Sequence, residues 1–224
     1  MKGQLIVKSI RNIATLISCL GLLVSTPLLA DESVVFEDAM DTLNNWSKGP
    51  ALVTSDDTVD HAPYMKMGNN ITYAQLPQQL TGDWTLQADV RHTNFSRGLS
   101  IGLYDKELKQ GYAALWDSSL EKYFDGKGML VITKVVGKDG GKIAFKSDVK
   151  RLGKPITGMQ LVNDPKFQRL TLTWEAATGK LTLSANGKVL QTVTDTEFKS
   201  FDYVALRGNT HSLLDNVKIT TPKK

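Results

Sequence analysis

Apolar and polar residues alternate with a period of two along much of this chain, and no segment shows a sustained helical period. The alternation is clearest in residues 84–91, 170–175 and 181–185. Side chains of a strand point alternately to its two faces, so this pattern is typical of strands with one buried face. The other predicted strands are 99–104, 112–116, 129–136, 189–193, 203–207 and 217–220. The chain is therefore predicted to be an all-β protein.

Turn residues separate the predicted strands at short intervals. Asn186-Gly187 lies between two apolar runs, and this dipeptide favours a tight hairpin because both positions accept positive φ angles. Residues 177–180 and 138–141 are predicted to form further turns, and the predicted helices are short, at 39–44 and 118–124. Many short strands with regular turns indicate two packed antiparallel sheets.

The N-terminus has the three parts of a secretory signal peptide. A basic start ends at Arg11, residues 13–24 are almost wholly apolar, and Ala30 precedes two acidic residues. The apolar run is shorter than the roughly 20 residues that span a bilayer, so no stable membrane span is predicted. We predict a cleavable signal peptide at 1–30, export to the periplasm or the cell exterior, and one domain at 31–224.

The leader also allows a second interpretation. Leu16-Ile17-Ser18-Cys19 resembles a bacterial lipoprotein box, and cleavage before Cys19 would leave a lipidated cysteine. Residues 20–24 stay apolar, whereas a lipoprotein tether is normally polar. This favours cleavage after Ala30.

Removing the leader changes the charge and cysteine arguments. The whole chain has 27 basic and 23 acidic residues, and three of the basic ones lie in the leader, so the mature chain has a net charge of +1. That balance gives no basic surface for nucleic acid, and no nucleic-acid partner is predicted. Cys19 is the only cysteine, which excludes disulfides and cysteine-bound zinc from the mature domain.

Several segments together carry a family resemblance. They are VFED at 35–38, WTLQADVR at 84–91, GLSIGL at 98–103, LTLTW at 170–174, GKLTL at 179–183, NGK at 186–188 and LDNVKI at 214–219. Over residues 33–222 the chain resembles the concanavalin A-like lectin/glucanase jelly rolls, including the laminin-G-like domains of bacterial secreted proteins. The resemblance implies a two-sheet antiparallel jelly-roll sandwich with a concave face, where such proteins often hold glycans.

The catalytic motifs of that family's enzymes are missing from the sequence. A glucanase of this fold would show Glu-x-Asp-x-x-Glu, and an alginate-lyase-like jelly roll would show Arg-x-Glu-x-Arg and Gln-x-His. The acidic strand position Asp89 is flanked by Gln87 and Arg91 instead. No Gly-x-Ser-x-Gly elbow or phosphate-binding glycine loop is present. These departures favour a binding protein over an enzyme.

Alternation also assigns side chains to faces. If the strands share the concave sheet, its face carries Asp89, Arg91, Tyr112, Trp116, Tyr203 and Arg207. Aromatic rings and arginines suit a sugar, and two arginines would also suit an acidic glycan. A shift of one residue reverses every face, which would place Tyr112 and Trp116 in the core. For Asp89 and Arg91 the alternative is a surface ion pair without a binding role.

Two histidines and three acids complete the candidate residues. His92 and His211 are predicted to contribute to the glycan site because they lie at or near loops at a sheet rim, although plain surface histidines are the alternative. The resemblance implies that the first and last strands are neighbours, where a structural calcium is common. Glu37, Asp38 and Asp215 are its predicted ligands, because carboxylate oxygens suit Ca²⁺. Solvated acids are the alternative.

Three functions remain open on this sequence. The first is an exported carbohydrate-binding protein with a polysaccharide or oligosaccharide partner on its concave sheet. The second is a divergent glycoside hydrolase or polysaccharide lyase, with acid–base groups drawn from Asp89, His92, Tyr112, Asp117, Glu121 and His211. The third is a structural protein of the cell envelope, which predicts a flat polar face with no pocket.

Overall fold

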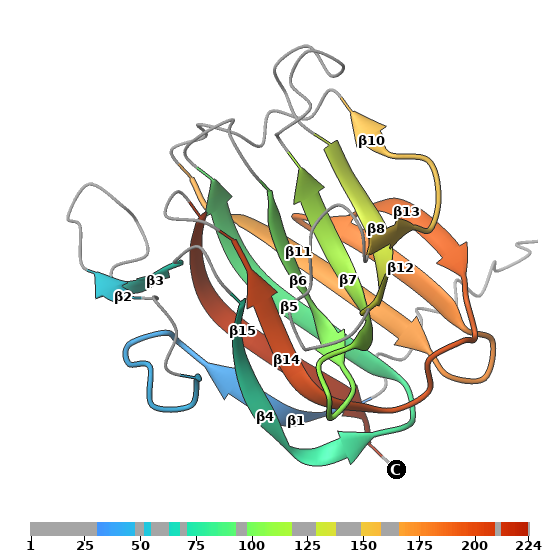
Figure 1. Ribbon diagram of the computed structural model, residues 1–224, viewed down its shortest axis with the longest axis horizontal. Coiled ribbons are helices and arrows are strands. Elements are labelled where there is room, and N and C mark those ends of the chain that lie inside the picture. The colour runs from blue at the N-terminus through green and yellow to red at the C-terminus, as the bar shows by residue number, and fades with distance from the viewer. Residues whose placement is uncertain are drawn as a thin grey trace, which may run out of the picture. The chain divides into compact units, whose positions relative to one another are not determined.

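The alternating segments form β-strands in two antiparallel sheets, called sheet A and sheet B below (Figure 1). The computed structural model describes residues 31–47, 52–54, 63–67, 71–92, 98–117, 129–137, 149–157, 166–208 and 212–223. The predicted signal peptide, the turn at 138–141 and the helix at 118–124 lie outside these residues. None of the described segments forms a helix with the length and hydropathy that crossing a membrane requires.

Sheet A has the strand order β13-β12-β11-β5-β15-β3-β2, and β1 also pairs with β15. Its strands are β1 (Glu32–Asp38), β2 (Leu52–Thr54), β3 (Tyr64–Lys66), β5 (Trp84–His92), β11 (Gln168–Glu175), β12 (Lys180–Ala185), β13 (Lys188–Thr194) and β15 (Ser212–Pro222). The first and last strands are thus neighbours, as the resemblance implied.

Sheet B has the order β10-β8-β7-β6-β14-β4, and β9 also pairs with β8. Its strands are β4 (Ile71–Leu80), β6 (Leu99–Tyr104), β7 (Gln110–Asp117), β8 (Met129–Val136), β9 (Val149–Arg151), β10 (Ile156–Thr157) and β14 (Phe201–Arg207). The all-β two-sheet prediction is confirmed.

The predicted helix at 39–44 is wrong, because this segment forms turns instead. Met40 has a φ angle of 60°, which a right-handed helix cannot contain. The Asp38 carboxylate holds the turns in place: its Oδ1 accepts a hydrogen bond from the Met40 N–H at 2.7 Å, and its Oδ2 accepts one from Trp46 Nε1 at 3.1 Å. Local side-chain bonds to backbone of this kind compete directly with helix formation.

The core lies between the inner faces of the two sheets. In β5 the predicted inward set is confirmed, since Trp84, Leu86, Ala88 and Val90 are all buried in it. In β7 the predicted orientation is wrong: Tyr112 and Trp116 are fully buried in this core, and Ala113 faces the outer side of sheet B. The shift of one residue therefore applies to β7 alone.

Gln191 on β13 closes one side of the sandwich by bonding to sheet B. Both β9 and β10 pair with β8, and residues 152–155 connect them. Beside this connection the Ile132 N–H donates to Gln191 Oε1 at 2.7 Å. Gln191 Nε2 donates to the Lys154 carbonyl at 2.8 Å. Gly153 makes room for it, because a Cβ at this φ of +144° would lie 2.8 Å from Gln191 Nε2.

We expect Gln191→Ala to lower the free energy of unfolding by about 1–3 kcal/mol, because it leaves the Ile132 N–H without its acceptor. Urea unfolding followed by circular dichroism measures the change. Gln75→Ala is the control, since Gln75 is exposed on β4. Equal stability of the two variants would show that Gln191 does not join the sheets.

Candidate functional site

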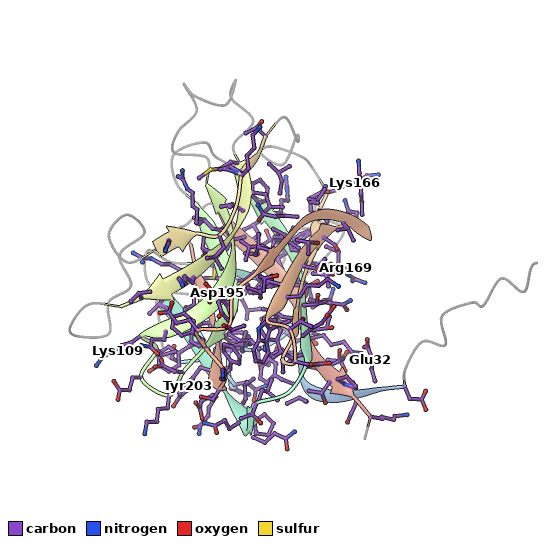
Figure 2. The ribbon with its side chains drawn as sticks, turned by 90° about the vertical axis from the view of Figure 1, so that its right-hand side faces the viewer. Glu32, Lys109, Lys166, Arg169, Asp195 and Tyr203 are labelled. Atoms are coloured by element: carbon purple, nitrogen blue, oxygen red, sulfur yellow. The ribbon has the colours of Figure 1, made fainter. Side chains whose placement is uncertain are left out.

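A polar cleft of about 500 Å³ lies on the outer face of sheet A, over β1, β5, β11 and β15. Glu32, Glu37, Asp38, Ala39, Gln87, Arg169, Asn216 and Lys218 line it. Figure 2 shows Arg169 between Lys166 and Glu32 along one flank of the sandwich, with Lys109 and Tyr203 on the opposite flank.

Arg169, which lines this cleft, is bound by Asp89 of the neighbouring strand. They are direct neighbours on β5 and β11 and both point outward from the core. Arg169 Nε donates to Asp89 Oδ1 at 2.8 Å and Nη2 donates to Asp89 Oδ2 at 2.7 Å. The Asp89 side chain is 4% exposed and that of Arg169 is 54% exposed. A buried carboxylate thus holds a guanidinium whose other edge faces solvent.

The ion pair also fixes the charge of Arg169. The hydrogen bond with Asp89, and then its negative charge, raise the pKa of Arg169 despite the opposing effect of burial. Replacing Arg169 would leave Asp89 buried without its cation, a state that proteins avoid. Arg169 is therefore held in one position rather than free to move with solvent.

A β-bulge in β15 brings Asn216 to the same place. The register with β5 shifts between Asp215 and Lys218, and Asn216 has a φ angle of 47°. Its Nδ2 donates to Asp89 Oδ2 and to Asp215 Oδ2, both at 3.0 Å. Bulges commonly re-aim a side chain next to a functional site, and here the bulge adds a second group oriented by Asp89.

The wall of the cleft on the β1 side carries acids with defined partners. Lys218 Nζ lies 3.2 Å from Glu37 Oε1, in an exposed ion pair. Asp38 is committed to the turns after β1, where its Oδ2 also accepts a hydrogen bond from Asn45 Nδ2 at 2.8 Å. The cleft as a whole offers amide and guanidinium donors beside carboxylate acceptors. That combination can hydrogen-bond to a ligand rich in hydroxyl groups.

The structure brings together only part of the predicted site. Asp89 and Arg91 share the outer face of β5, and Asp89 pairs directly with Asp215 in the sheet register. The predicted calcium ligands Glu37 and Asp38 line the same cleft. Across the described ranges, however, no three acidic, histidine or cysteine side chains are grouped as metal ligands. The calcium site stays a prediction.

The predicted single face is wrong, because β5 belongs to sheet A whereas β7 and β14 belong to sheet B. Tyr203 and Arg207 do face outward on β14, between the inward side chains of that strand, and the Tyr203 ring meets Tyr73 edge-on with centroids 5.5 Å apart. Arg207 lies near Tyr104 of β6. Burial raises the pKa of the Tyr104 phenol to about 12, although a hydrogen bond with Ser100 and the positive charge of Arg207 both act to lower it.

The remaining candidates are only partly placed. The backbone of His92 ends β5, but its side chain, the side chain of Asp117, and all of His211 and Glu121 lie outside the described residues. Of the predicted acid–base groups, Asp89 and Tyr112 are described, and they occupy different places: Asp89 the outer face of sheet A and Tyr112 the core. These two do not share a cleft.

Sequence reasoning missed Arg169, Asn216 and Lys218. The alternation of Leu170, Leu172 and Trp174 places Arg169 on the outward face, so its orientation could have been inferred. Its partner could not, because Asp89 lies 80 residues earlier and no local pattern shows that β11 pairs with β5. The bulge that turns Asn216 outward likewise depends on the pairing of β15.

A second cleft, of about 410 Å³, lies at the turn between β6 and β7 and the connection from β13 to β14. Asp105, Glu107, Glu197 and Asp202 are among its lining residues. Asp105 Oδ1 already accepts the Lys109 and Gln110 N–H groups, at 2.8 and 3.1 Å, and Asp202 accepts Gln79 Nε2 at 3.1 Å. This cleft is built around turn-stabilising contacts.

No protein-family model and no curated protein matches the sequence. Solved structures match the fold. The carbohydrate-binding module CBM66 from Bacillus subtilis is similar with a TM-score of 0.53 and 13% identity, over 79% of this chain and 96% of the module. A Bacillus subtilis protein of unknown function with a galectin-like fold gives 0.55 and 11%, over 87% and 100%.

A third solved structure shows the same likeness. β-Agarase A in complex with oligoagarose is similar with a TM-score of 0.59 and 7% identity, over 86% of this chain and 94% of the agarase. Identities this low establish architecture and leave the ligand open. With its two antiparallel sheets and these structural neighbours, the chain has the concanavalin A-like jelly-roll fold.

Proposed function

We propose that this protein is an exported carbohydrate-binding protein that holds a glycan in the polar cleft of sheet A. The observation that carries the proposal is the Asp89–Arg169 pair, in which a buried carboxylate orients an exposed guanidinium inside a cleft. A planar guanidinium takes two hydroxyl oxygens at once, as vicinal hydroxyls of a sugar require.

The partners of Arg169 in the cleft extend this match. Gln87 supplies an amide group, which both donates and accepts, and Asn216 and Glu37 supply acceptor oxygens. Sugars carry donors and acceptors on the same hydroxyl, so a mixed wall suits them better than a wall of one kind. The fold likeness to a carbohydrate-binding module and to an oligoagarose complex supports the same class of ligand.

Binding without catalysis is the form that the cleft supports. Both carboxylate oxygens of Asp89 accept hydrogen bonds from Arg169, and Oδ2 also accepts one from Asn216, so Asp89 is engaged by contacts within the protein. Hydrolysis of a glycosidic bond needs two carboxyl groups flanking the scissile bond, one of them able to give up a proton. The secretory pattern of residues 1–30 supports export, which brings the domain to extracellular or envelope glycans.

Arg169→Lys is the direct test. Lysine keeps a positive charge beside Asp89 but lacks the planar fork, so we expect glycan affinity to fall about tenfold or more, or at least 1.4 kcal/mol. The ligand is first found on a glycan array, and its dissociation constant is then measured by calorimetry for both proteins. Thermal unfolding confirms that the variant is folded.

Arg151→Lys is the matched control, because Arg151 is an exposed arginine on β9 of the other sheet. Its affinity should equal that of the wild type. Absence of binding to every glycan on the array, or an unchanged dissociation constant in Arg169→Lys, would overturn the proposal.

A further inference from the structure

Threonines form a continuous row across the outer face of sheet A. Thr220 on β15 pairs with Thr85 on β5, which pairs with Thr173 on β11. Thr173 pairs with Thr182 on β12, which pairs with Thr192 on β13. Directly opposed residues of an antiparallel pair point to the same face, so five threonines line up across five adjacent strands. Thr220 is buried, and the other four are at least partly exposed.

A second row runs beside the first and begins inside the cleft. Lys218 pairs with Gln87, Gln87 with Thr171, and Thr171 with Ser184. Lys218 and Gln87 also line the cleft. The rows therefore extend the floor of the cleft toward β12. Threonine is common in strands in any case, and this continuity with the cleft is what gives the rows a functional meaning.

The spacing of the rows fits a chain of sugars lying across the strands. Neighbouring strands lie about 4.8 Å apart, so each row offers one side chain at every step of that length. A pyranose ring in an extended chain advances by a comparable step. A ligand of several sugars can thus repeat the same contact on successive strands.

The twist of the sheet favours a single polysaccharide chain as the ligand over the flat surface of a crystalline polysaccharide. Adjacent strands rotate by roughly 20–25°, so four steps turn the row by roughly 80–100°. A flat lattice of hydroxyls cannot follow this rotation. A single flexible chain can, because each glycosidic linkage has its own torsion angles.

The charges of the cleft select against an acidic chain. Glu32, Glu37 and Asp38 outnumber the two cations that line it, Arg169 and Lys218. Arg169 is already neutralised by Asp89, and Lys218 is paired with Glu37. A carboxylate or sulfate on the ligand would therefore approach carboxylates without a free cation among the lining residues to offset the repulsion.

We propose that the ligand is an uncharged linear polysaccharide, bound by its internal sugars, which enters the cleft at Arg169 and crosses β5, β11 and β12 along the hydroxyl rows. This inference rests on the proposed function of the cleft and names its ligand class. It replaces the acidic glycan that Arg91 and Arg207 allowed on sequence grounds, because those two arginines lie on different sheets, on β5 and β14.

One set of titrations tests how affinity depends on the length of the oligosaccharide, on its charge and on the threonine hydroxyls of the row. Calorimetry is run with cello-, manno- and laminari-oligosaccharides of two and six sugars, and with hexagalacturonate. The variant Thr173→Val/Thr182→Val removes two hydroxyls while keeping side chains of similar shape that favour strands. Thr157→Val, on β10 of sheet B, is the control.

We expect one neutral hexasaccharide to bind at least tenfold more tightly than its disaccharide, and the double variant to lose most of that difference without a change for the disaccharide. Equal affinity for both lengths, an unchanged hexasaccharide affinity in the double variant, or tighter binding of hexagalacturonate would overturn the inference and leave the binding function standing. If no sugar binds the wild type, the proposed function falls and this inference falls with it.

Discussion

Trp116→Ala is expected to lower the free energy of unfolding by about 3–5 kcal/mol, since it removes the largest class of side chain from a closed core. Trp116 is fully buried on β7, between Leu99 of β6 and Leu130 of β8. In a domain of this size the loss corresponds to a fall in Tm of roughly 6–20 °C. Urea unfolding followed by circular dichroism measures it, with an unchanged m-value as the sign that the denatured state is the same.

Val189→Ala provides the comparison, because Val189 is 60% exposed on the edge strand β13. A change of no more than about 0.5 kcal/mol is expected there. A near-neutral Trp116→Ala, or one that abolished glycan binding while leaving stability intact, would mean that Trp116 faces outward after all.

The face of β7 could not be read from the sequence, and the reason is physical. Residues 111–116 are buried on both sides, so no polar residue between Tyr112 and Trp116 marks an exposed face. Alternation is informative only where one face meets water, as in β5 and β11. In β5 the inward and outward sets, from Trp84 to Val90, were predicted correctly.

Strand existence was the most predictable feature. The bounds of β6 and β8 match the prediction to the residue, and β5, β11 and β12 match within two residues. β4 was missed, because Gln75, Pro77 and the glutamines that follow it interrupt the apolar pattern. Those residues suit an edge strand, where proline and exposed polar groups are tolerated.

Strand pairing is the information that local sequence lacks, and the site depends on it. Asp89 meets Arg169 from β11 and Asn216 from β15, across 80 and 127 residues. The sequence identified Asp89 as an outward acid on a strand but supplied neither partner. An acid in the middle of a strand remains a useful signal, since such a group needs a cation or donors once neighbouring strands cover it.

A second large loss of stability is expected from Lys134→Met, on β8 of sheet B. Lys134 Nζ lies 2.7 Å from Asp195 Oδ2, with the two side chains 9% and 12% exposed. Tyr112 donates its hydroxyl hydrogen to Asp195 Oδ1 at 2.6 Å and accepts the Phe198 N–H at 3.1 Å. This network ties β7 and β8 of sheet B to the segment that leads from β13 to β14. Removing the cation leaves Asp195 buried without its charge partner, which costs about 3–5 kcal/mol.

The pKa shifts in this network set the pH window in which the loss appears. Burial acts to raise the pKa of Asp195, but the bonds from Lys134 and Tyr112 outweigh it and lower that pKa. For Lys134, burial acts to lower the pKa and the bonds to Asp195 and Glu197 raise it. The contribution of Asp195 to the free energy of unfolding is fully present above the pKa of this residue in the unfolded chain. It is lost as pH falls through the lowered pKa of the folded state. The contribution of Lys134 to the free energy of unfolding is fully present below the pKa of this residue in the unfolded chain. It is lost as pH rises through the raised pKa of the folded state.

The stability difference between wild type and Lys134→Met should therefore be constant from about pH 5 to about pH 9 and shrink on either side. Urea unfolding at a series of pH values measures it. Glu197→Gln is the matched control, because Glu197 also pairs with Lys134 but is 50% exposed, and a loss below about 1 kcal/mol is expected. The double variant Lys134→Met/Asp195→Asn should lose less than the sum of its single variants, since neither charge is then left alone. Strict additivity, or a difference that grows as pH falls below 4, would show that the two charges act independently and that the network does not hold the layers together.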